Sequence, residues 1–253
     1  MPGPDHPFAN SNATCPPTAW TQVLAAGQGQ ADALEDLCRA YWPPAYAFFR
    51  HQGQAPPEAQ DLVQSFFDRR VLRGQLLQGI SPDQGRFRSW FYQSLRHHLH
   101  HARERAAAVR NGGAALHVPL DWPSFAEAEA QFQHSAASAS PPETHFDREY
   151  AVTLIQRVYQ RLADEYAQLG KAAWFTALAP YLTHTQERGD YARLATQLDT
   201  TEGALRVAAN RLRNSFSEAI RNEILKTLRD PGELHDELQH LLRAWWQAGA
   251  PTP

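Results

Sequence analysis

Apolar residues recur every three or four positions along most of this 253-residue chain. That spacing gathers them on one face of an α-helix, whereas a half-buried strand would alternate apolar and polar residues. Because no run of alternating β-branched residues occurs, we predict an all-α fold. The periodicity predicts helices, by residue number, at 18–26, 31–51, 56–73, 86–106, 147–169, 171–183, 190–198, 202–228 and 231–247.

Glycine and proline residues separate the predicted helices, and they divide the chain into larger units. The stretch between the fourth and fifth helices has few periodic apolar residues and reads as a linker joining two small helical domains. Pro43 and Pro44 should kink or split the second helix. The predicted units are a disordered tail (1–17), a first helical domain (18–110), the linker (111–147), a second helical domain (148–229) and a C-terminal extension (230–253).

Several protein classes are excluded by simple counts. No window approaches the ~18–20 uninterrupted apolar residues that cross a bilayer, so we expect no membrane span. The first residues lack the basic and apolar segments of a secretory signal. Two cysteines, Cys15 and Cys38, are too few for a disulfide framework. We therefore expect a cytoplasmic protein.

Positive charge is concentrated in two segments of a chain whose formal net charge is −3. Residues 86–110, here called the first basic island, carry +5, and residues 191–229, the second basic island, carry +3. The segments 111–150 and 230–253 carry −5 and −3. Two separated basic islands favour contact with a polyanion at two places.

The second basic island has the plan of a helix-turn-helix motif. A short helix precedes a turn in which Asp199 lies three residues before Glu202, the spacing of a capping box. The longer helix that follows would bury Leu205, Ala208, Leu212, Phe216 and Ala219 or Ile220, and would expose Thr201, Arg206, Asn210, Arg211, Arg213 and Ser217. Arginine and asparagine suit guanine and adenine edges in the major groove. The alternative is a plain helical hairpin with a solvated basic face.

The first basic island combines aromatic and basic residues on one helix. Its buried stripe would contain Phe87, Trp90, Phe91, Leu95, Leu99 and Ala102. A second face would expose Tyr92, Arg96, His100 and Arg103, close to an exposed Arg86 and Arg88. Cations that meet phosphates and rings that stack on unpaired bases suit single-stranded DNA. A core helix whose arginines extend to solvent is the alternative.

A histidine cluster on the same helix raises the question of a metal. His97 and His101 are four residues apart and could share one ion. However, the glutamate of the HExxH motif is missing, and only Glu104 lies nearby as a further ligand. We therefore predict no metal site and no cofactor. No catalytic constellation is visible either, so we expect no enzymatic activity.

Three motifs, two in the first half of the chain and one in the second half, carry a resemblance to a known family. DLVQSFF at 61–67, followed by FRSWFYQSLRHHL at 87–99, resembles the second conserved region of the extracytoplasmic-function sigma factors of the sigma-70 family. YARLATQLDTTEGALRVAANRLR at 191–213 resembles their fourth region. The two halves occur in the order and spacing of that family, over about residues 18–229.

The resemblance implies a promoter-specificity subunit of bacterial RNA polymerase. The helix at 58–70, with Asp61, Gln64 and Asp68 on its polar face, would bind the β′ coiled coil of the core enzyme. The helix at 86–106 would read the −10 element as single strands through Arg86, Arg88, Tyr92, Arg96, His97, His100 and Arg103. The helix-turn-helix would read the −35 element while its domain packs on the β flap. An anti-sigma factor or another regulator is a further partner that the resemblance allows.

Two questions stay open at the level of the sequence. A polymerase-independent helix-turn-helix regulator, acting as a homodimer, is the main rival to the sigma-factor interpretation, and a metal hydrolase is a distant third. The acidic helix at 231–247 carries an apolar stripe that ends in Trp245 and Trp246, so it must dock on something. It would either extend the core of the second domain or lie across a basic island and mask it.

Overall fold

The computed structural model describes residues 20–72, 76–77, 80–81, 86–108, 125–135, 141–182 and 190–246. Within these residues the chain forms helices and no strands, which confirms the all-α prediction. The helices are α1 (Thr21–Gly27), α2 (Ala31–His51), α3 (Pro56–Phe66), the π-helical η1 (Phe67–Leu72), α4 (Phe87–Ala108), α5 (Phe125–Ser135), α6 (Pro142–Gln168), α7 (Ala172–Leu178), the 3₁₀-helix η3 (Ala179–Leu182), α8 (Asp190–Gln197), α9 (Glu202–Leu225), the 3₁₀-helix η4 (Pro231–Glu233) and α10 (Leu234–Trp246).

Helix α2 spans the predicted residues, but it is not split at its two prolines. Pro43 and Pro44 lie inside one unbroken helical segment. A proline inside a helix removes a hydrogen bond and costs about 3 kcal/mol. Large side chains on both sides of the prolines, among them Tyr41, Trp42, Tyr46, Phe48 and Phe49, are at most 1% exposed. Their burial on one continuous face offsets that cost.

The predicted linker contains more helix than expected. Helix α5 lies inside it, and α6 begins at Pro142 rather than at 147. Both helices bury apolar residues, including Ala128 and Phe132 of α5 and Phe146 of α6. The expectation of an irregular linker is therefore wrong for 125–135 and 142–147. The predicted tail at 1–17 and the linker residues 111–124 and 136–140 lie outside the described residues.

The larger of two hydrophobic cores, here called the first core, is built mainly from aromatic rings. Tyr41 lies at its centre, with its ring centroid 5.2 Å from that of Phe87 and 4.6 Å from that of Phe91. Helices α1–α4 supply most of this core, and the first half of α6 adds Phe146 and Tyr150. The end of α9 and helix α10 complete it.

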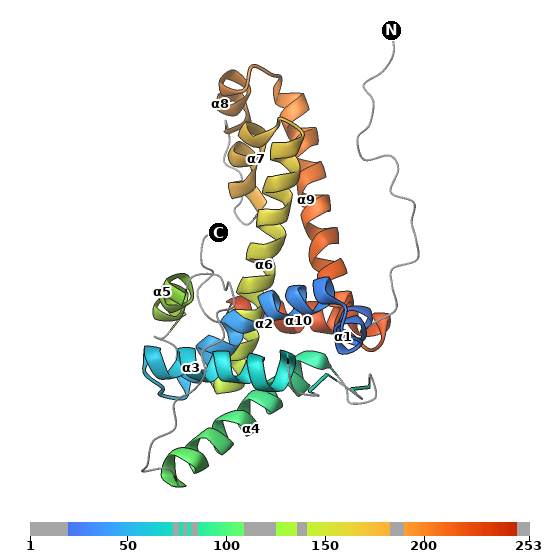
Figure 1. Ribbon diagram of the computed structural model, residues 1–253. Helices are drawn as coiled ribbons and strands as arrows, with labels where there is room; N and C mark the ends of the chain where they lie inside the picture. The colour runs from blue at the N-terminus through green and yellow to red at the C-terminus, as the bar shows by residue number, and fades with distance from the viewer. Residues whose placement is uncertain are drawn as a thin grey trace.

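The second core lies at the other end of α6 and α9. It joins the second half of α6 to α7, α8 and the first half of α9, through Val158, Phe175, Leu194 and Leu212 among others. Figure 1 shows α6 and α9 side by side, with α7 and α8 beside one end and α1, α2 and α10 near the other. The boundary predicted at residue 148 falls inside α6. The division into two domains stays a prediction.

Helix α10 packs on its own chain, against the first core and not against the second. Leu241 and Trp245 are buried in the first core, and α10 contacts α6 and α9. Helix α10 therefore extends the first core, to which α6 and α9 of the predicted second domain also contribute. The far side of the apolar stripe remains in contact with solvent, since Leu242 is 46% and Trp246 65% exposed. None of the described helices is both long and apolar enough to cross a membrane.

Candidate nucleic-acid interface

Helices α8 and α9 meet in a short turn that begins α9 at a defined residue. The N-cap of α9 is Thr201, whose hydroxyl accepts a hydrogen bond from the backbone N–H of Ala204 at 3.2 Å. Asp199 has a positive φ of 48° and does not cap the helix, so the capping box predicted from Asp199 is wrong. Thr201 has the extended backbone that an N-cap requires, with φ −99° and ψ 151°.

The buried face of α9 matches the prediction except for a small rotation. Leu205, Leu212 and Ala219 are buried against the second core as expected. Ala209 is buried, whereas Ala208 and Phe216 are only half-buried. This packing holds α9 against Tyr191, Leu194 and Ala195 of α8 and fixes which residues face solvent.

The opposite face of α9 is available to a ligand. Thr201, Arg206, Asn210 and Arg211 are exposed, and Arg213 is half-buried. The guanidinium of Arg206 lies 5.0 Å from the centre of the Tyr191 ring and 3.4 Å from a carboxylate oxygen of Glu202. Exposed contacts of this kind contribute little in water, so a nucleic acid can displace them at small cost.

Helix α4 brings four of its predicted DNA-binding residues together. Arg96, His97, His100 and Arg103 are exposed and line one open cavity of about 430 Å³ with Gln52 and Gln93. Arg96 donates a hydrogen bond to the side chain of Gln93 at 3.0 Å. Arg103 donates one to the backbone carbonyl of Gln52, also at 3.0 Å. These contacts hold the two guanidinium groups at the rim of the cavity.

Arg88 and Tyr92 are not on the surface, so their predicted exposure is wrong. Arg88 is 4% exposed; it forms an ion pair with Asp147, and it donates to Glu237 Oε1 from Nε at 3.1 Å and from Nη2 at 2.8 Å. Tyr92 packs between Phe48 and Phe146, and its burial raises the pKa of the phenol. The carboxylates that neutralise Arg88 come from α6 and α10, which the pattern of α4 alone cannot reveal.

Arg86, directly before α4, is half-buried and lies close to two glutamates, one at the end of η4 and one at the start of α10. Its Nη1 lies 2.9 Å from Oε2 of Glu237, and its Nε lies 3.9 Å from Oε2 of Glu233. His240, also on α10, has its Nε2 2.6 Å from Oδ2 of Asp147. Helix α10 therefore neutralises the beginning of the first basic island and leaves its second half open.

The residues proposed from the family resemblance to bind polymerase lie on α3 and η1. Asp61 is exposed, whereas Gln64 and Asp68 are half-buried. Ser65, on the same helix, is half-buried, and its Oγ lies 3.0 Å from Nε2 of the buried His98. The polar face of this segment is therefore partly directed toward α4.

A metal site at the histidine cluster lacks the necessary geometry. His97 and His101 line different cavities. Nδ1 of His101 lies 3.0 Å from a carboxylate oxygen of Glu104. Across the described part of the chain, no three His, Cys, Asp or Glu side chains are grouped so that they could hold a metal ion.

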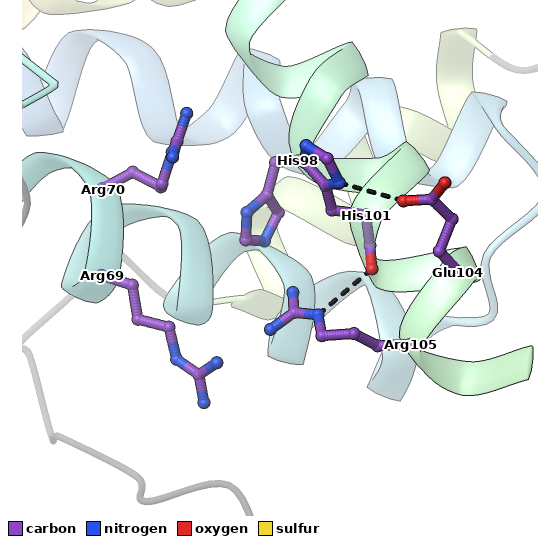
Figure 2. A pocket seen from close by; sticks show the side chains of 6 residues that line it. All are labelled: Arg69, Arg70, His98, His101, Glu104 and Arg105. Atoms are coloured by element: carbon purple, nitrogen blue, oxygen red, sulfur yellow. Dashed lines mark hydrogen bonds and ion pairs between the residues drawn. The ribbon is translucent and has the colours of Figure 1, made fainter. Parts of the chain in front are cut away.

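Sequence reasoning missed one group of basic residues. Arg69 and Arg70 of η1 line a second cavity beside α4, together with His98, His101, Glu104 and Arg105 (Figure 2). The adjacent pair of arginines was the available signal. The net charge of segment 1–85 is negative, so a count of charge by segment does not reveal this pair.

Comparison of the chain with models of known protein families, with curated proteins and with solved structures found no match. The sigma-factor interpretation therefore depends on the motifs themselves and on where the fold positions their residues.

Proposed function

We propose that this protein is a sigma factor of the extracytoplasmic-function type, which directs bacterial core RNA polymerase to specific promoters. The observation that carries the proposal is the free polar face of α9. It follows a capped turn and presents Arg206, Asn210 and Arg211 away from the core. A helix of this kind can lie in the major groove with its first turns against base edges.

Three surfaces divide the work in this proposal. Helix α9 reads duplex DNA at the −35 element. The exposed half of α4, with Arg96, His97, His100 and Arg103, binds the −10 element as single strands, since its cations can pair with phosphates around an open cavity. Asp61, with Gln64 and Asp68 beside it, contacts the β′ coiled coil.

A fourth surface supports the docking of a protein on the second half of the chain. Leu169 and Val207 are 44% and 52% exposed, and both line a cavity of about 400 Å³ between the end of α6, α7 and α9. Lys171 and Trp174 also line it, and so does Arg211, which the hollow shares with the polar face of α9. Exposed apolar residues that line a hollow are typical of protein-binding sites. In the proposal this hollow receives the flap of the β subunit.

The test is binding to core polymerase and run-off transcription from a genomic library. Asp61→Arg should weaken binding to core at least tenfold without loss of the fold, because Asp61 is exposed and the apolar face of α3 is opposite. Gln64→Ala should weaken it less. Asp164→Arg, the same change at an exposed carboxylate of α6, is the matched control and should alter binding less than twofold.

Two results would contradict the proposal. Unchanged co-purification of Asp61→Arg with core polymerase would remove the assigned contact surface. A wild-type protein that does not bind core polymerase, but binds a palindromic duplex as a dimer, would instead establish the polymerase-independent regulator.

A further inference from the structure

A cavity of about 480 Å³ lies between η1 and α4, outside the surfaces assigned above (Figure 2). Its volume falls within the range of small-ligand sites. Arg69 and Arg70 line it from η1, and His98, His101, Glu104 and Arg105 line it from α4. Among the described residues, three arginines and one carboxylate thus line this hollow.

The guanidinium groups of the cavity have unused donors. In the described part of the structure, the side chains of Arg69 and Arg70 make no hydrogen bond or ion pair, and both residues are exposed. Arg105 uses its Nε to donate to the backbone carbonyl of His101 at 3.1 Å. Its remaining nitrogens are free to donate into the cavity. Each guanidinium can offer paired N–H groups to an oxyanion.

The carboxylate of Glu104 is engaged by neighbouring histidines. One oxygen lies 3.0 Å from Nδ1 of His101, and the other lies 3.3 Å from Nε2 of His100. In Figure 2, Glu104 and His101 lie on one side of His98, and Arg69 and Arg70 lie on the other. Glu104, the one acid among the described residues that line the cavity, therefore does not neutralise the two arginines of η1.

His98 lines the cavity but adds no positive charge to it at pH 7. Its side chain is buried, and its Nε2 is within hydrogen-bond distance of Ser65 Oγ. Burial, followed by the charges of Arg105, Arg70 and Arg69, lowers the pKa of His98 to about 4. His98 is consequently neutral at pH 7, and the positive charge of the cavity belongs to the arginines.

We propose that this cavity binds a phosphate group, held by the guanidinium groups of Arg69, Arg70 and Arg105. Three fixed positive charges in a hollow complement a multivalent oxyanion better than a single carboxylate. Such a phosphate group could belong to the backbone of a nucleic acid strand or to a free polyphosphate or nucleotide. The site does not include the residues assigned to DNA or polymerase, so this inference does not depend on the proposed function.

The first part of the test uses pyrophosphate and the full chain in isothermal titration calorimetry. The double substitution Arg69→Gln/Arg70→Gln should weaken binding at least tenfold. Both side chains are exposed, so the circular dichroism spectrum and Tm should not change. Arg39→Gln/Arg243→Gln removes the same charge from two exposed arginines elsewhere and should weaken binding less than twofold.

The second part repeats the comparison with a fluorescent single-stranded oligothymidylate. If the source is a strand, the double substitution should weaken strand binding at least tenfold, and pyrophosphate should displace the strand. If the source is a free phosphate compound, strand binding should be unchanged while pyrophosphate binding is lost. The proposal is overturned if Arg69→Gln/Arg70→Gln weakens neither probe more than the control does.

Discussion

Both basic islands carry an excess of positive charge, but their basic residues have different surroundings in the structure. In the second island, Arg206, Asn210 and Arg211 remain on an exposed face of α9. In the first island, Arg88 is buried between carboxylates of α6 and α10, and Arg86 pairs with Glu237 of α10. Only the second half of α4 presents its cations to solvent.

This difference separates the charge of a segment from the charge that a ligand can reach. The acidic extension at 230–253 was expected either to support a core or to mask a basic island, and α10 does part of each. It buries Leu241 and Trp245 while its Glu237 covers the first turn of α4. A local count of positive charge therefore overestimates the positive surface that α4 presents to any ligand.

The largest expected effect comes from removing the buried cation of the first island. Arg88→Met should lower the free energy of unfolding by about 3 kcal/mol, because Glu237 and Asp147 stay buried after losing a partner. Urea unfolding measures this loss. Arg39→Met removes an exposed pair with Glu35 and should cost less than about 0.5 kcal/mol. Equal stabilities of the two variants would show that α10 is not held by this ion pair.

The first and second cores should also differ in how acid changes their stability. Burial, followed by nearby positive charge, lowers the pKa of His51 and that of His98 to about 4, and His98 packs on the first core. The unfolded chain binds these protons near pH 6.5, before the native protein does. Stability should therefore fall as the pH decreases from about 6.5 to 4.

Urea midpoints at pH 7 and pH 5 test this prediction. His98→Asn, which cannot titrate, should have a smaller difference between the two midpoints than the wild type. Within the described residues, the second core contains no histidine with a shifted pKa, so substitutions there should leave the difference unchanged. A wild-type midpoint that does not fall between pH 7 and pH 5 would contradict the neutral state of the two histidines.

The smallest effect is expected for a single contact of the exposed island. Arg206→Ala should weaken binding to duplex promoter DNA by about 1–3 kcal/mol and reduce its salt dependence if the lost contact is to a phosphate. Fluorescence anisotropy at several salt concentrations measures both quantities. Arg161→Ala, at an exposed arginine of α6, is the control. An affinity that is indifferent to Arg206 and to salt would exclude α9 as the DNA-binding helix.

Much of the secondary structure could be predicted because it depends on local patterns. The 3.6-residue periodicity located α2 to the residue, and Gly and Pro residues located most helix ends. The failures have physical causes. Helix α5 is short and has few apolar residues, so it becomes recognisable only where Ala128 and Phe132 pack on their neighbours. Thr201, rather than Asp199, became the cap because the turn places Asp199 in a left-handed conformation.

The sequence by itself determined that this chain is helical, that its apolar faces form cores, and that α9 has a basic side opposite a buried one. The tertiary structure decided which charges remain available. Arg88 and Glu237 are 149 positions apart, and the cavity of Arg69, Arg70 and Arg105 joins side chains of η1 and α4, so neither the buried ion pair nor the cavity follows from a local pattern. Periodicity specifies the faces of a helix, but the partner of each face is selected by packing between elements distant in sequence.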